Sequence, residues 1–266
     1  MSEVNTQTEG FNLERYLRVA GATRPEAFDW SAAEPPLDRE ALFCLGYMMD
    51  IESHTIIYLR ELLATRIAED PSITSFLSCW AYEEFFHSKV LQRLLEAQGV
   101  TVEEERFARL RRRKAGDHLQ MGIARVLARI TRHFGAVHMT WGAINELSTL
   151  IGYRALVARS GNPLVAQVLG RIIKDERRHY AFYFNQARDR LRPRAAQLLT
   201  SLIVRKFWSP VGSPVRGDAD AGRVCSYLFN DEEGSRRLRL LDSSIALLPG
   251  LGWFDRGISL IKQPKA

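Results

Sequence analysis

Apolar residues recur at steps of three and four along most of the chain, which is the spacing of one face of an α-helix. Asp70-Pro71-Ser72 and Ser160-Gly161-Asn162-Pro163 interrupt this pattern with residues typical of turns and helix ends. The pattern therefore predicts four long helices, over residues 37–68, 72–99, 118–160 and 163–191.

The connections between these helices indicate the fold. Short turns join the first helix to the second and the third to the fourth, so each pair is expected to form an antiparallel hairpin. Residues 101–117 are charged and rich in arginine, and we expect them to form an exposed crossover between the hairpins. This connectivity predicts an all-α fold, a ferritin-like four-helix bundle with additional helices and a C-terminal extension.

The chain divides into three predicted regions. Residues 1–36 form an N-terminal lead, residues 37–207 the bundle, and residues 208–266 a C-terminal extension. The extension begins with a stretch rich in Gly, Pro and Asp and is weakly patterned after it, so the sequence does not predict its structure.

Composition excludes several classes of protein. Of the 266 residues 46% are hydrophobic and 26% are charged, as in globular proteins with a packed core. No run approaches the roughly 18 apolar residues of a membrane span, and we expect a cytoplasmic protein that binds no nucleic acid. The three cysteines, an odd number at wide spacing, are expected to be reduced and at least half buried.

The formal net charge of +6 suggests an acidic partner or substrate. Part of this charge is concentrated in one run, which consists of Arg109, Arg111, Arg112, Arg113 and Lys114. A solvated helix end explains the same run equally well.

Acids and histidines at helical spacing provide the candidate chemistry. Glu84 and His87 lie three residues apart and share one face of the second helix, and Glu176 and His179 repeat that spacing in the fourth. The first and third helices each carry one acid between apolar residues, Glu52 and Glu146. A single Glu-x-x-His is usually an exposed pair, but two copies, each preceded by a helix with one acid, indicate a metal centre.

The spacing of these six residues supports one common centre. Glu52 and Glu84 are 32 positions apart and Glu146 and Glu176 are 30, so each hairpin returns its ligands to nearly the same height. Four carboxylates and two imidazoles suit two iron ions, Fe2+ or Fe3+, although manganese stays open. Asp175, next to Glu176, is expected to accept a hydrogen bond from the distal nitrogen of His87.

These motifs resemble those of the soluble acyl-acyl-carrier-protein (acyl-ACP) desaturases, over roughly residues 42–191. The second-helix motif Trp-x-x-Glu-Glu-x-x-His and the fourth-helix motif Asp-Glu-x-Arg-His both occur here, as Trp80, Glu83, Glu84 and His87, and as Asp175, Glu176, Arg178 and His179. The family also has a Thr three residues after the third-helix Glu, which is matched by Thr149.

The resemblance implies an O2-dependent enzyme that introduces a double bond into a carrier-bound acyl chain. It implies O2 as co-substrate, a ferredoxin-like electron donor, an acyl carrier protein docked at the basic run, a homodimer, and proton delivery by Thr149. That threonine could equally be a helix residue that bonds its own backbone.

Other functions of such a centre stay open. They are a monooxygenase of a small molecule (a hydroxylase or an N-oxygenase), an oxidase like the ribonucleotide reductase small subunits, and a non-enzymic ferritin-like iron protein. The additional fourth-helix histidine of N-oxygenases is missing, because Ile172 and Ile173 lie one turn before Glu176.

Overall fold

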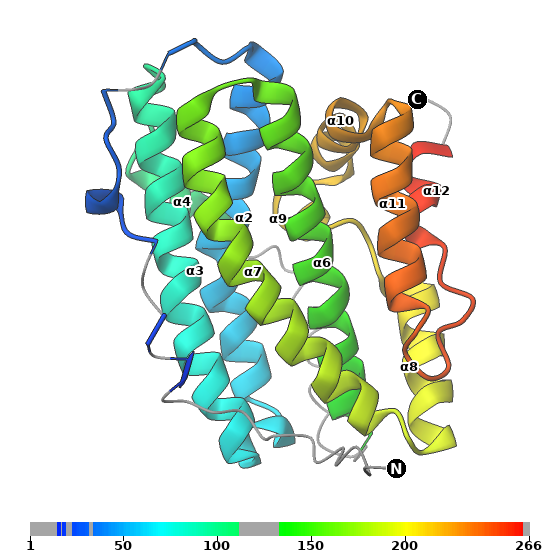
Figure 1. The fold of residues 1–266 in the computed structure, drawn as a ribbon. Helices are drawn as coiled ribbons and strands as arrows, with labels where there is room; N and C mark the ends of the chain where they lie inside the picture. Colours follow the sequence, from blue (N-terminus) through cyan, green and yellow to red (C-terminus); the bar gives the residue numbers. More distant parts are fainter. Residues whose placement is uncertain (1–14, 17, 20–22, 32–33, 112–132, 263–266) are drawn as a thin grey trace, which may run out of the picture.

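The structure is a computed structural model, which describes residues 15–16, 18–19, 23–31, 34–111 and 133–262. Every regular element in these residues is helical (Figure 1). The prediction of an all-α, ferritin-like bundle is confirmed.

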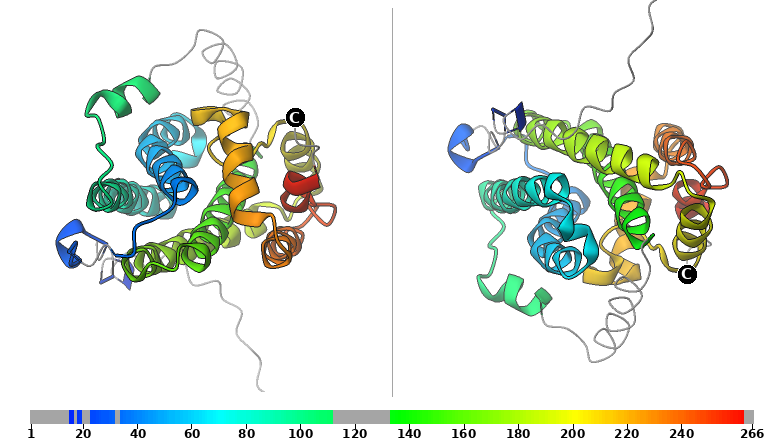
Figure 2. Two further views of the ribbon diagram at one scale, coloured as in Figure 1. Left: turned by 90° about the horizontal axis from the view of Figure 1, so that it is seen from above. Right: turned by 90° about the horizontal axis from the view of Figure 1, so that it is seen from below.

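Four long helices form the bundle. They are α2 (Arg39–Leu63), α3 (Pro71–Ala97), α6 (Phe134–Ser160) and α7 (Pro163–Arg190). α2 packs against α3 and α6 against α7, and the two hairpins meet through contacts of α2 with α6 and of α3 with α7. The helix axes surround a common interior, as the end-on views of Figure 2 show.

Polar residues fix where these helices begin. Asp38 caps α2 by accepting a hydrogen bond from the backbone N–H of Ala41, and Asp70 and Asn162 cap α3 and α7 in the same way, each followed by a proline. α6 ends at Gly161, whose φ of +59° is in the left-handed region that favours glycine. Both predicted turns are thus confirmed as helix boundaries.

Two of the caps also join distant parts of the chain. Asp70 accepts a hydrogen bond from Arg190 at the end of α7 over 2.6 Å, and the amide of Asn162 donates to the carbonyl of Pro35 over 2.6 Å. The start of each hairpin's second helix is therefore tied to a segment outside its own hairpin.

A close contact between α6 and α7 depends on Gly142. A Cβ atom at this position would lie 2.3 Å from the ring of Tyr183, so only a glycine allows the two helices their present separation. Tyr183 is fully buried and its ring also meets those of Phe76 and Trp80 on α3.

The crossover between the hairpins differs from a purely exposed connection. Residues Glu105–Arg111 form a short helix, α4, which packs on α2. Arg106 of α4 makes two hydrogen bonds to the buried carboxylate of Asp50, at 2.6 and 2.8 Å. Residues 112–132, which include the predicted start of the third helix at 118, lie outside the described residues.

The C-terminal extension is helical and packs on the bundle, which the sequence did not predict. It follows α8 (Arg194–Phe207) and comprises α9 (Ser213–Arg216), α10 (Asp218–Phe229), α11 (Glu232–Ile245) and α12 (Arg256–Lys262). α8, α10 and α11 lie beside α6, across the bundle from α3 (Figures 1 and 2). Their buried side chains, such as Leu228 and Leu241, belong to the same hydrophobic core as those of the bundle.

None of the helices in the described part of the chain is long and apolar enough to cross a membrane. Cys44 and Cys79 are buried and Cys225 is half buried, and all three are unpaired, as expected.

Candidate metal centre

The bundle interior brings together the six residues that the sequence selected. Glu52 comes from α2, Glu84 and His87 from α3, Glu146 from α6, and Glu176 and His179 from α7. None of them is more than 7% exposed. The matched spacing of the two hairpins therefore does place all six at one level of the bundle.

Their polar atoms form two groups that share members. In one group, ligand atoms of Glu52, Glu84, His87 and Glu176 all lie within 4.8 Å of one another, and in the other those of Glu84, Glu146, Glu176 and His179 do. Glu84 and Glu176 belong to both groups. A pair of cations held here would accordingly share these two carboxylates, and each would have one further carboxylate and one imidazole within reach.

The two imidazoles turn their Nδ1 atoms toward this centre. Nδ1 of His87 lies 3.3 Å from Oε1 of Glu176, and Nδ1 of His179 lies 3.2 Å from Oε1 of Glu84 and 3.5 Å from Oε2 of Glu176. The same nitrogen of His179 lies 3.5 Å from Glu146, and that of His87 3.8 Å from Glu52.

Several of these buried atoms have no hydrogen-bond partner of adequate geometry among the described residues. They are Oε1 of Glu84, both carboxylate oxygens of Glu176, and Nδ1 of His87 and of His179. Burial without a partner is costly for such groups, and metal coordination would satisfy all of them at once. The set of donors therefore fits a pair of divalent or trivalent cations.

The close packing of these buried acids also shifts their pKa values. Burial, together with the charge of Glu176, raises the pKa of Glu146 to about 8. Burial and the charges of Glu52 and Glu176 raise the pKa of Glu84 well above its usual range. Burial acts in the same direction on Glu176, but the nearby imidazoles of His179 and His87 outweigh it and hold its pKa below the usual range. Without cations, the centre must retain protons.

The far nitrogen of each histidine is held by a carboxylate from the opposite helix. Nε2 of His87 on α3 lies 3.1 Å from Asp175 on α7, and Nε2 of His179 on α7 lies 2.9 Å from Glu83 on α3. Arg178 donates to both carboxylates, at 2.7 Å each. These contacts fix the ring orientations that aim both Nδ1 atoms at the centre.

The contact of Asp175 agrees with the expectation from the sequence, whereas Glu83 was given no role there. A signal was present, because Glu83 and Asp175 occupy the same position, directly before the Glu of a Glu-x-x-His. The acid that precedes each Glu-x-x-His therefore contacts the histidine of the other copy, on the opposite helix.

Further polar contacts come from residues that the sequence did not single out for this purpose. Tyr153 donates to Glu52, Trp80 donates to Glu146 over 3.0 Å, Tyr16 donates to Glu83, and Thr23 donates to Asp175 over 2.7 Å. Tyr16 and Thr23 belong to the N-terminal lead, which carries no pattern that could have placed them here.

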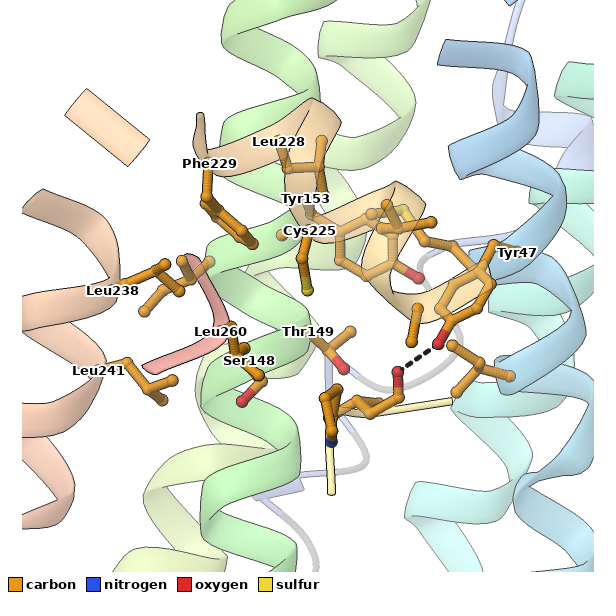
Figure 3. Close-up of a pocket in the computed structure, with 18 of the residues that line it drawn as sticks. Tyr47, Ser148, Thr149, Tyr153, Cys225, Leu228, Phe229, Leu238, Leu241 and Leu260 are labelled. Atoms are coloured by element: carbon orange, nitrogen blue, oxygen red, sulfur yellow. Dashed lines mark hydrogen bonds between the residues drawn. The ribbon is translucent and has the colours of Figure 1, made fainter. Parts of the chain in front are cut away.

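Thr149 lies in the wall of a pocket that also includes Glu52 and Tyr153 (Figure 3). Its neighbour Ser148 donates to the carbonyl of Ile144 over 2.7 Å, which is the backbone bond of an ordinary helix serine. Thr149 makes no such bond within the described residues. Its predicted part in proton delivery stays a prediction.

The basic run is only partly described. Arg109 is exposed and pairs with Glu103 beside α4, and Arg111 is the last residue of α4. Arg112, Arg113 and Lys114 lie outside the described residues.

Fold and centre together define an all-helical, ferritin-like bundle with a buried cluster of carboxylates and histidines, suited to two bridged cations. A family model described as fatty acid desaturase matches residues 56–206, more than half of the chain. The chain belongs to this family, the type 2 or acyl-ACP desaturases. The match begins after Glu52 and ends before α9.

Membership in a desaturase family indicates an oxidoreductase. No curated protein and no solved structure matched the chain in the corresponding searches.

Proposed function

We propose that this protein is an O2-dependent di-iron oxidoreductase that introduces a double bond into a carrier-bound acyl chain. The observation that carries the proposal is the sharing of Glu84 and Glu176 between two four-ligand groups inside a desaturase-family bundle. Carboxylates from all four helices and one Glu-x-x-His from each of two helices are the ligand pattern of di-iron and di-manganese bundle proteins.

When bound, the iron pair would supply the reduction of O2 and the oxidising power needed to remove two hydrogens from an unactivated chain. An external, ferredoxin-like donor supplies two electrons. O2, these two electrons, two protons and the two hydrogens removed from the substrate then give two molecules of water. Desaturation and hydroxylation start from the same hydrogen removal.

The residues of this chain hold and shield the centre. Glu84 and Glu176, which belong to both groups of ligands, would hold both cations, and Tyr153 and Trp80 restrain Glu52 and Glu146 through hydrogen bonds. The rings of Phe76, Tyr183 and Trp80 pack beside the histidines and acids and keep bulk water away from them. Thr149 is the candidate for bringing protons to the centre from the pocket side.

Metal analysis tests the centre directly. We expect two irons per chain in the purified protein, and loss of most of that iron in Glu84→Ala, because the variant removes a ligand that both groups share. Glu96→Ala is the matched control, since Glu96 lies on the same helix and pairs with Arg93 at the surface. A wild-type protein that binds no iron when iron is added to it under anaerobic conditions would contradict the proposal.

Turnover tests the reaction. The iron-loaded protein, supplied with O2 and a reduced ferredoxin, should form an alkene from acyl chains on a carrier protein faster than from the free acids. An alcohol product would instead identify a monooxygenase, and a cage that holds many irons per chain would identify an iron-storage protein.

The basic run is the proposed docking site for the acidic carrier protein. Reversing the charge of Arg109, Arg111 and Arg112 together should raise the KM for carrier-bound substrate and leave the iron content unchanged, because charges of opposite sign attract the partner during encounter. Equal KM values in the variant and the wild type would exclude this docking site.

A further inference from the structure

Two of the four carboxylates in the candidate metal centre belong to one ligand group only. They are Glu52 of α2 and Glu146 of α6, and we call them the outer carboxylates. Oε2 of Glu52 lies 3.8 Å from Nδ1 of His87. In the same way, Oε2 of Glu146 lies 3.5 Å from Nδ1 of His179. Since both nitrogens are candidate ligands, the two Oε2 atoms are the oxygens placed to bind a cation together with them.

The other oxygen of each outer carboxylate accepts a hydrogen bond from an aromatic side chain. The hydroxyl of Tyr153 donates to Oε1 of Glu52. The indole N–H of Trp80 donates to Oε1 of Glu146 over 3.0 Å. An indole N–H can only donate, and a hydroxyl that faces an ionised carboxylate must donate as well. Tyr153 is fully buried and Trp80 is 3% exposed, so bulk water has little access to either bond.

Each donor comes from the hairpin opposite to the acid that it holds. Tyr153 is on α6 and reaches Glu52 on α2. Trp80 is on α3 and reaches Glu146 on α6. Seven residues, or about two helical turns, separate Tyr153 from Glu146 and Trp80 from His87, so each donor shares a helix face with a ligand of its own helix. The two halves of the centre therefore have the same arrangement.

The shared carboxylates, Glu84 and Glu176, are held differently. Both oxygens of Glu176 and Oε1 of Glu84 have no hydrogen-bond partner among the described residues. Oε2 of Glu84 accepts a long hydrogen bond of 3.3 Å from Thr55. The carboxylates that would serve two cations thus keep oxygens available, whereas each outer carboxylate has one oxygen occupied by a donor.

We propose that Tyr153 is a positioning residue that limits Glu52 to one ligand oxygen. Trp80 does the same for Glu146. A carboxylate that binds through both oxygens fills two coordination positions of a cation, so holding one oxygen leaves each cation a position for a small ligand from outside the chain. Such an open position distinguishes catalytic from purely structural metal sites. The inference rests on the proposed function, since it concerns the two cations that the centre would hold.

Cobalt(II) in place of iron tests the inference without turnover. Its visible absorption weakens as its coordination number rises, so the spectrum reports whether a carboxylate binds through one oxygen or two. Azide is the probe of the open position. Titration of the cobalt-loaded, full-length protein with azide gives the dissociation constant.

Tyr153→Phe removes the hydroxyl, retains the ring and frees Oε1 of Glu52 to bind the cation. We expect weaker cobalt absorption and azide binding that is about tenfold or more weaker, because the position that azide needs is filled. Trp80→Phe should act in the same way through Glu146. Tyr58→Phe is the matched control, since the hydroxyl of Tyr58 is buried but has no hydrogen-bond partner among the described residues. It should keep the wild-type spectrum and azide affinity.

The inference would be overturned by unchanged absorption and azide affinity in a Tyr153→Phe variant that binds two cobalt ions, or by a cobalt-loaded wild type that does not bind azide. Loss of cobalt from Tyr153→Phe would also overturn it, because Glu52 would then need the hydrogen bond in order to bind at all. Tyr153→Phe keeps the core filled, so a folded variant is available even if Trp80→Phe does not fold. Metal content separates the inference from the proposed function: two bound cobalt ions with no effect of the variant disprove the inference and leave the centre standing, whereas a wild type that binds neither iron nor cobalt disproves both.

Discussion

At the scale of single residues, the centre depends on support from outside the six proposed ligands. Each histidine has one nitrogen facing the ligand cluster and the other on a carboxylate of the opposite helix. Arg178 joins the two carboxylates, and the positive charge of His179 together with its hydrogen bond helps hold the pKa of Glu83 below the usual range although burial opposes this. Burial opposes ionisation of Asp175 as well, but its hydrogen bond with His87 holds its pKa below the usual range. Both supporting acids therefore favour the ionised form, which accepts hydrogen bonds from the rings.

Glu83→Gln tests whether this support matters for metal binding. The amide keeps the shape of the side chain but removes the charge that fixes His179, so iron affinity should fall about 10- to 100-fold. Asp175→Asn should cause a similar loss through His87. Competition with a chelator measures both affinities.

Glu96→Gln, on the same helix as Glu83 but at the surface, should bind iron as the wild type does. Unchanged affinity in both Glu83→Gln and Asp175→Asn would show that ring orientation is fixed by packing alone.

At the scale of helices, the hairpins were predictable and the close contacts between them were not. Periodicity and the turn residues near Asp70 and Gly161 predicted the four helices, because neighbouring residues in the sequence determine where a helix begins and ends. The equal height of the six ligands followed from counting along two hairpins. The close approach of α6 to α7 could not be predicted in this way. Nothing in the sequence near Gly142 shows that the ring of Tyr183, 41 positions later, fills the space that a side chain at position 142 would occupy.

Gly142→Ala should therefore lower the free energy of unfolding, by about 1–3 kcal/mol, since the added methyl group forces α6 and α7 apart in the core. Gly170→Ala is the matched control in a neighbouring helix. A Cβ atom there meets nothing within 4 Å, so this variant should be about 0.5–1 kcal/mol more stable than the wild type. Urea unfolding measures both values, and equal gains in stability would contradict the close contact.

At the scale of the whole molecule, the crossover and the C-terminal extension meet at one buried acid. Asp50 on α2 is fully buried and accepts hydrogen bonds from Arg106 of α4 and from Arg216 of α9. The sequence could not show this, because the three residues come from separate regions and a buried aspartate on a helix has no local signature. The consequence is that α4 and the start of the extension are both anchored two residues before Glu52.

Asp50→Ala should leave Arg106 and Arg216 without their shared partner in a largely buried site. Removing one partner of a buried ion pair typically costs about 3–5 kcal/mol, and we expect a loss of that size in urea unfolding. A second ion pair serves as the control, because Glu40 of the same helix binds Arg223 of the extension, with side chains 40% and 38% exposed.

Solvent screens that exposed pair, so Glu40→Ala should lower the free energy of unfolding far less than Asp50→Ala does. A similar loss of unfolding free energy in the two variants would mean that the ion pairs of Asp50 stabilise the fold no more than an exposed ion pair does. The expected difference between them would show instead that the buried contacts of Asp50 with α4 and α9 stabilise the fold more than the exposed contact of Glu40 with α10 does.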